Sequence, residues 1–225
     1  MIAAHDLDDV AGQLRSALGL NEPFADPGVE HFGLRNAVFA LRDSFLEVVS
    51  PIRPDTSAGR LLDRRGGDCG YMLMLQVADL PGARDRVRGL GIREVFEVSL
   101  DDMAEVHLHP ADMRAAIVSL SQPQPPSAWR WGGPNWQQRR ADGLELSGAT
   151  VTVSKPVEIA DRWASVVDEP IGETGVRFSA DEVERGLTEI IVKADPERVP
   201  AAGADGPLRI GGVEFVFEPD EEEEG

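Results

Sequence analysis

One pattern recurs along this chain and limits the folds open to it: a short apolar segment that leads into an amphipathic helix. The pattern occupies residues 2–20, returns at residues 74–92 and occurs more faintly at residues 151–167. A spacing of roughly 70 residues is too long for a solenoid, whose repeats are about 20–50 residues long. The spacing instead predicts a small β-α-β-β-β module that is used several times, and so an α+β protein.

Hydrophobic periodicity places the elements of each module. The first module is expected to hold a helix at 8–19 and a hairpin of strands at 34–41 and 44–49. The elements expected in the second module are a strand at 71–77, a helix at 81–90 and strands at 94–98, 105–109 and 115–120. Those expected in the third are a strand at 149–153, a helix at 157–167 and strands near 177–178, 187–192 and 212–217.

Segments rich in Gly and Pro separate the modules and suggest the domain boundaries. Residues 51–70 predict a linker, and the Trp-rich residues 124–140 predict an extended connector. Trp129, Trp131 and Trp136 either cover an apolar pocket or fasten the connector to the third module, and we favour the second role. The predicted order is a pair of modules at 1–123 (1–52 and 70–123), the connector, a third module at 141–217 and a disordered acidic tail at 218–225.

The charge of the chain excludes several partners. With 40 acidic and 22 basic side chains, the formal charge is −18, which repels phosphate backbones and anionic lipid. We therefore expect neither nucleic acid nor a membrane as a partner, which leaves a small-molecule ligand and a second copy of the chain as the partners still open. Apolar runs are too short to cross a bilayer, no signal peptide is visible, and the single Cys69 fits a reducing cytoplasm.

Several motifs carry a resemblance to a known family. They are Asp6-Leu7 and Asp79-Leu80 at the helix starts, Leu18-Gly19-Leu20 and Leu90-Gly91-Ile92 at the helix ends, and the segments 33–39, 45–51 and 107–120. In their order and spacing these residues resemble the vicinal oxygen chelate superfamily, the glyoxalase-like and methylmalonyl-CoA-epimerase-like proteins. The resemblance covers residues 1–123 and extends to the third module only in outline.

The resemblance implies a fold and a metal site. Two modules would form a half-open glyoxalase-like barrel, followed by a third similar module. A divalent metal would be held by one His and one Glu from each module and would act as a Lewis acid. Only Glu47 stands at an implied ligand position: the first His would fall upstream of Met1, and Met72 and Ser119 occupy the second module's two positions. Thioether and hydroxyl groups do not suit a hard or borderline cation, so the implied ligand set is incomplete. A divalent metal is the one candidate cofactor, and the cofactor is otherwise unknown.

Two strands carry further candidate residues. Glu47 alternates with Phe45 and Val49 on an apolar face, so its carboxylate needs either a partner such as Arg35 or a role as ligand contact or general base. On the strand before it, Asn36 rather than Arg35 is expected to point into the cavity, because Val38 and Ala40 share its face.

His107 and His109 are two residues apart on a predicted strand and would share a face with Glu105. There they could bind a metal or a substrate carboxylate or relay protons, or they could be surface residues. His109 could also simply hydrogen-bond a turn. His5 and His31 are expected at the surface, and residues 64–68 are a flexible linker or an anion cradle.

Three functions are compatible with these residues. The first is a protein that binds a small polar or carbonyl-containing ligand in its barrel with a degenerate metal-ligand set. The second is a divalent-metal-dependent isomerase, epimerase or lyase that uses a non-standard set including Glu47 and His107 or His109. The third is a structural protein whose third module drives dimerisation.

Overall fold

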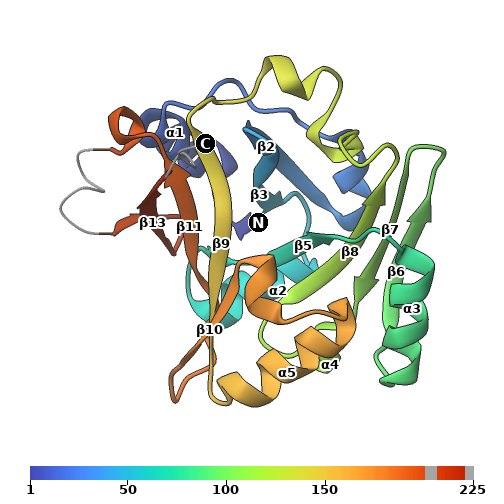
Figure 1. The fold of residues 1–225 in the computed structure, drawn as a ribbon. Helices are drawn as coiled ribbons and strands as arrows, with labels where there is room; N and C mark the ends of the chain where they lie inside the picture. Colours follow the sequence, from blue (N-terminus) through green and yellow to red (C-terminus); the bar gives the residue numbers. More distant parts are fainter. Residues whose placement is uncertain (201–206, 221–225) are drawn as a thin grey trace. The chain divides into compact units, whose positions relative to one another are not determined.

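The computed structural model describes residues 1–200 and 207–220, and it divides into two compact units of mixed helix and sheet (Figure 1). Unit 1 contains residues 1–70, 131–147 and the described residues from 189 onward. Unit 2 contains residues 71–130 and 148–188. Among the described helices, none is long and apolar enough to cross a membrane.

Unit 1 is built around the first module. Its elements are β1 (Ile2–Ala3), α1 (Leu7–Leu18), β2 (Leu34–Leu41), β3 (Ser44–Pro51), α2 (Ser57–Arg65) and β4 (Cys69–Gly70). The sheet has the strand order β2-β3-β1-β4, and β2 and β3 form the predicted hairpin through a turn at Arg42, whose φ is +43°. Phe24 adds an isolated bridge to Val38 on the outer edge of β2.

Local sequence explains where α1 begins and ends. The Asp6 side chain accepts hydrogen bonds from the backbone N–H groups of Asp8 and Asp9, which caps the first turn. Gly19 adopts a left-handed conformation with φ of +60°, which ends the helix at little steric cost. The buried residues of the helix all lie on one face: Leu7, Val10, Ala11, Leu14 and Leu18.

Later segments complete unit 1. They are the first part of β9 (Leu144–Val153), the second part of β11 (Gly186–Ala194), β12 (Leu208–Ile210) and β13 (Val213–Pro219). β11 runs parallel to β13, and β12 pairs with β13 antiparallel. One apolar core joins α1 and the inner face of the hairpin to residues that come much later in the chain: Leu144, Ile190, Val192, Ile210, Val213 and Phe215.

Unit 2 is built around the second module. Its elements are β5 (Met72–Gln76), α3 (Leu80–Gly89), β6 (Glu94–Ser99), β7 (Met103–Leu108), α4 (Pro110–Met113) and β8 (Ile117–Pro123). The strand order is β5-β8-β7-β6, with β5 parallel to β8 and the other pairs antiparallel. The strand order β1-β3-β2 of unit 1 corresponds to the order β5-β8-β7 of unit 2. The isolated bridge from Phe24 to β2 corresponds to the pairing of β6 with β7. The shared order supports the repeated module.

The rest of unit 2 comes from the third module. It consists of the second part of β9, the first part of β11, α5 (Pro156–Val167) and β10 (Val176–Ala180), with β10 parallel to β9. Trp163 is the largest fully buried side chain, and its indole Nε1 donates to the Met113 carbonyl at 2.9 Å. Together α3 and α5 cover one face of the β7–β8 sheet with a single apolar core. β9 and β11 therefore each run from one unit into the other.

The α+β class, the repeated modules and a third module near the C-terminus are confirmed. The side-by-side pairing of residues 1–52 with 70–123 stays a prediction. The segment 51–70, which the sequence predicts as a linker, contains regular structure that the prediction did not include. This segment contains α2, where the Thr56 hydroxyl accepts from the Gly59 N–H at 2.9 Å and Ala58 and Leu62 are buried.

Two other expectations about irregular segments need correction. The acidic tail was expected to begin at residue 218, but β13 extends to Pro219 and Asp220 pairs with Arg42 at 2.6 Å. The remaining tail, 221–225, lies outside the described residues. The connector is not fully extended, because short 3-10 turns occur at Arg130–Gly132 and Trp136–Gln138.

Candidate functional site

In unit 1, two polar side chains lie on the face of the hairpin opposite the apolar core. Strand alternation places Ala37, Phe39 and Val48 in the core, and Asn36 and Glu47 on the other face. Asn36 donates from Nδ2 to Glu47 Oε1 at 2.8 Å, and its own Oδ1 accepts from the backbone N–H of Asp26 at 2.8 Å. Both side chains are buried. The amide is held at both ends, so it fixes the position of the carboxylate.

One of the two expectations for the Glu47 carboxylate was an ion pair with a residue such as Arg35. Arg35 does not pair with Glu47: its guanidinium contacts Asp8 of α1 at 3.0 Å. That alternative is wrong because Arg35 and Glu47 lie on opposite faces of the hairpin. Burial lowers the pKa of the Met1 α-amino group to about 6, and the negative charge of Glu47 opposes this lowering. Glu47 thus acts electrostatically on a neighbouring ionisable group.

In unit 2, polar side chains gather on two neighbouring strands. The antiparallel register sets His107 opposite Ser119 and Glu105 opposite Ser121, so all four share one face of the sheet. We call these four residues the β7–β8 polar face. The alternate residues of the same strands, Val106, Leu108, Val118 and Leu120, point into the apolar core. The sheet therefore buries a polar set on the face that α3 and α5 do not cover.

Glu105 and His107 form a tight pair on this face. His107 Nε2 lies 2.5 Å from Glu105 Oε1, and Ser121 Oγ donates to the second carboxylate oxygen, Oε2, at 2.8 Å. An ionised carboxylate only accepts, so Nε2 carries the shared proton and Nδ1 becomes the acceptor nitrogen of the neutral ring. The Phe96 ring packs 4.8 Å from the imidazole, centroid to centroid. These contacts fix the orientation of His107.

Ser119 has an unusual environment for a buried hydroxyl. Its side chain is fully buried, yet Oγ has no hydrogen-bond partner among the residues that the structure describes. A hydroxyl withdrawn from water without a partner costs about 1–3 kcal/mol. In natural proteins such a group needs an explanation, and an absent ligand or water is a common one. Ser119 is therefore the residue that points most directly to a bound molecule.

Two further candidates of unit 2, His109 and Met72, differ in their position relative to this face. His109 does not share the strand face with His107, because β7 ends at Leu108 and Pro110 begins α4. Instead its Nδ1 accepts from the Ala111 N–H at 3.1 Å, so the alternative that it hydrogen-bonds a turn is confirmed. Met72 is buried in β5 two residues before Met74, which pairs with Ser119, and so lies on the same face as Ser119.

The residues present do not fit the metal that the resemblance implies. Among the described residues, no group of three or more His, Cys, Asp or Glu side chains could hold a metal ion. Met72 and Ser119 stand at two implied ligand positions, and their thioether and hydroxyl are poor ligands for a hard or borderline divalent cation. We therefore derive no chemical step through a metal.

His5, the arginines of residues 64–68 and Cys69 do not form a binding or catalytic site in the part of the chain that the structure describes. His5 lies 3.1 Å from Asp68, and Arg64 and Arg65 occupy the last turn of α2, whose carbonyl ends do not favour an anion. Burial raises the pKa of the Cys69 thiol, which makes it a poor nucleophile.

Two tryptophans of the connector contact the first two modules. Trp136 packs edge-on against Phe45 of β3 with ring centroids 5.0 Å apart, whereas we had favoured a contact with the third module. Trp129 donates from Nε1 to Gln76 Oε1 of β5 at 2.7 Å. The connector is therefore fastened to β3 in unit 1 and to β5 in unit 2.

Sequence reasoning missed Ser121. The only available signal was its spacing from Ser119, because two serines two residues apart on a strand share a face. The pairing of these serines with Glu105 and His107 depends on strand register, which the sequence does not specify.

Comparisons with known proteins agree with the fold. A family model described as a glyoxalase-like domain matches residues 1–167. A hypothetical protein from Staphylococcus aureus is similar over 97% of this chain and 99% of its own, with a TM-score of 0.64 and 12% identity. Methylmalonyl-CoA epimerase from Mycobacterium tuberculosis aligns with 54% of this chain and 83% of its own, at 24% identity and a TM-score of 0.48. The Streptomyces coelicolor epimerase aligns with 54% and 92%, at 23% identity and 0.47. A search of curated proteins found no match.

Proposed function

Because this chain belongs to the glyoxalase-like domain family, we propose that it binds a small polar or carbonyl-containing ligand at the β7–β8 polar face, without the metal set usual in the superfamily. The observation that carries the proposal is the Ser119 hydroxyl, which is fully buried and has no partner among the described residues. A ligand carbonyl that accepts a hydrogen bond from Ser119 Oγ would remove the cost of this burial.

The Glu105–His107 pair adds a chemical function to this binding. Glu105 holds the Nε2–H of His107, so the opposite nitrogen, Nδ1, can accept a proton. If the ligand carbon next to the carbonyl lies at Nδ1, His107 can remove a proton from that carbon and return it. Ser119 would stabilise the negative charge that develops on the carbonyl oxygen. This arrangement supports reversible proton exchange at that carbon, or an isomerisation in which His107 moves the proton along one face of the ligand.

A binding experiment tests the first part of the proposal. The purified protein is titrated with small 2-oxo acids, 2-oxoaldehydes and acyl-CoA thioesters, and binding is followed by calorimetry. We expect Ser119→Ala to lose affinity for whichever ligand binds, by about tenfold. Ser99→Ala, an exposed serine on β6 of the same sheet, is the matched control and should leave affinity unchanged. Equal affinity of the wild type and Ser119→Ala would contradict the proposal.

A separate experiment tests proton transfer. In D2O, a ligand whose acidic carbon is deprotonated and reprotonated gains deuterium, which mass spectrometry detects. We expect His107→Gln to abolish this exchange while the ligand still binds. Deuterium uptake that is unaffected by His107→Gln would exclude His107 as the base but leave the binding proposal standing.

Metal analysis decides between this proposal and the metal-dependent alternative. Glu47 is the only residue at an implied ligand position, and its carboxylate already accepts a hydrogen bond from Asn36. We expect no stoichiometric divalent ion in the purified protein. About one ion per chain that is lost in Glu47→Ala would refute the metal-free reading and favour a metal-dependent isomerase, epimerase or lyase.

A further inference from the structure

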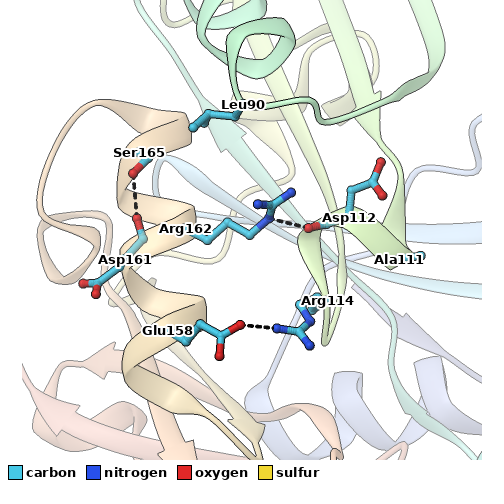
Figure 2. A pocket seen from close by; sticks show the side chains of 8 residues that line it. All are labelled: Leu90, Ala111, Asp112, Arg114, Glu158, Asp161, Arg162 and Ser165. Atoms are coloured by element: carbon cyan, nitrogen blue, oxygen red, sulfur yellow. Dashed lines mark hydrogen bonds and ion pairs between the residues drawn. The ribbon is translucent and has the colours of Figure 1, made fainter.

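A pocket in unit 2 lies among the helices, on the side of the β7–β8 sheet away from Ser119. It has a volume of about 500 Å³, a size typical of small-molecule sites. The C-terminal end of α3, the residues of α4 and the outer face of α5 form its walls (Figure 2). The lining residues are Leu90, Ala111, Asp112, Arg114, Glu158, Asp161, Arg162 and Ser165.

Arg162 is the cation lining this pocket that has no carboxylate partner among the described residues. Its Nε donates to the backbone carbonyl of Asp112 at 2.5 Å, and no carboxylate of the described residues forms an ion pair with it. In Figure 2 its guanidinium points from α5 towards the backbone at Asp112, while the carboxylate of Asp161 points away from it. Because Nε is occupied by the carbonyl, the two terminal nitrogens remain to face the pocket.

Two of the three lining acids, Asp112 and Glu158, are already paired with cations other than Arg162. Asp112 accepts from Arg93 at 2.8 Å, and this guanidinium holds the pKa of the carboxyl well below its usual range. Glu158 contacts Arg114 at 2.5 Å and Lys155 at 3.3 Å, and both contacts lower the pKa of Glu158. Of the two cations that line the pocket, Arg114 is paired with Glu158, whereas Arg162 forms no ion pair with a carboxylate of the described residues.

We propose that this pocket binds the oxyanion group of a small molecule, a carboxylate or a phosphate, through the terminal nitrogens of Arg162. The planar fork of a guanidinium matches two oxygens of either group and forms two parallel charged hydrogen bonds. The backbone contact of Nε orients the fork before the ligand arrives, which reduces the entropy lost on binding. Leu90 at the rim, 40% exposed, offers an apolar contact to the rest of the molecule.

Direct titration of the full chain tests this proposal. Inorganic phosphate and succinate are added separately at constant ionic strength, and binding is followed by calorimetry and by the NMR signal of the Arg162 Nε–H group. We expect saturable binding of at least one probe, and the tighter probe identifies the class of oxyanion. No saturable binding of either probe would overturn the proposal.

Variants locate the bound anion. Arg162→Gln should weaken binding about tenfold or more, because it removes charged hydrogen bonds. Arg162→Lys keeps the charge but loses the fork, and should weaken binding less. Arg185→Gln is the matched control: it removes the same charge from an exposed residue of unit 2 that pairs with Asp181 outside the pocket. Equal losses in Arg162→Gln and Arg185→Gln would show only a general charge effect and refute the site.

One further variant should change binding in the opposite direction. Glu158→Gln removes the carboxylate that neutralises Arg114 and Lys155, so anion binding should tighten, by about threefold. This result does not depend on how well Arg162→Gln folds. Unchanged or weaker binding in Glu158→Gln would contradict the proposal. Loss of binding in Ser119→Ala but not in Arg162→Gln would place the anion at the β7–β8 polar face and refute this second site.

Discussion

Ser119 and Ser121 allow a test in which two very similar substitutions have opposite effects on stability. Both side chains are fully buried, on the same strand and the same face. Ser121 donates to Glu105 at 2.8 Å, whereas the Ser119 hydroxyl has no partner among the described residues. The two Ser→Ala changes remove the same atom from the same sheet and differ only in the hydrogen bond that is lost.

The magnitudes follow from these contacts. Removing the Ser119 hydroxyl relieves a desolvation cost of about 1–3 kcal/mol and leaves a void of only an oxygen atom, worth about 0.3 kcal/mol. Ser119→Ala should therefore be more stable than the wild type by about 1 kcal/mol. Ser121→Ala loses a hydrogen bond to a buried carboxylate and should be less stable by about 2 kcal/mol. The two variants should differ by about 3 kcal/mol.

Two measurements check this difference. Urea unfolding followed by circular dichroism gives the free energy of unfolding, provided that the slopes of the variants agree. Hydrogen exchange of the β7 and β8 amides reports the stability of this sheet itself. If Ser119→Ala were destabilised as much as Ser121→Ala, the hydroxyl of Ser119 would have a partner in solution, and the argument for a ligand would fail.

Two further predictions concern other contacts. Asn36→Ala should lower the free energy of unfolding by about 1–3 kcal/mol, because Glu47 loses a buried hydrogen bond. The neighbouring Arg35→Ala breaks only an exposed ion pair and should lower it by less than about 1 kcal/mol. Urea unfolding measures both values. Arg84 holds the pKa of Glu94 below its ordinary value of 4.5, so this pair stabilises the fold above that pH and the effect is lost as pH falls through the lowered pKa. The difference in unfolding free energy between the wild type and Glu94→Gln should thus be present near neutral pH and vanish in acid, and a difference that grows in acid would contradict this sign.

The sequence predicted the elements whose signals are local. The helix at α1 and the β2–β3 hairpin have clear periods of apolar residues, and their observed bounds agree with the prediction to within about two residues. The helix α2 was missed because only Ala58 and Leu62 are buried along it, and Gly and Arg residues obscure the period. The Thr56 cap was the one local signal for that helix.

The candidate site was predictable only in part, for a similar reason. Alternation along a strand correctly placed Glu105 on the same face as His107. It failed at His109, where Pro110 ends the strand and starts α4. The contacts that define the site, Ser121 with Glu105 and the position of Ser119 opposite His107, join different strands. Such register is set by tertiary packing and is not encoded in either segment alone.

β9 and β11, the two strands that run from one unit into the other, affect how the chain folds during its synthesis. Unit 1 needs Val213 and Phe215 to close a core that begins at Ile2, and unit 2 needs Trp163 and Val176 to cover β7 and β8. During synthesis on the ribosome, neither half can finish folding when its first module emerges, so both wait for the later strands with apolar surface exposed. A ribosome that stalls between residues 130 and 185 would release two incomplete cores, and a truncation at residue 140 would damage both halves rather than remove a spare domain.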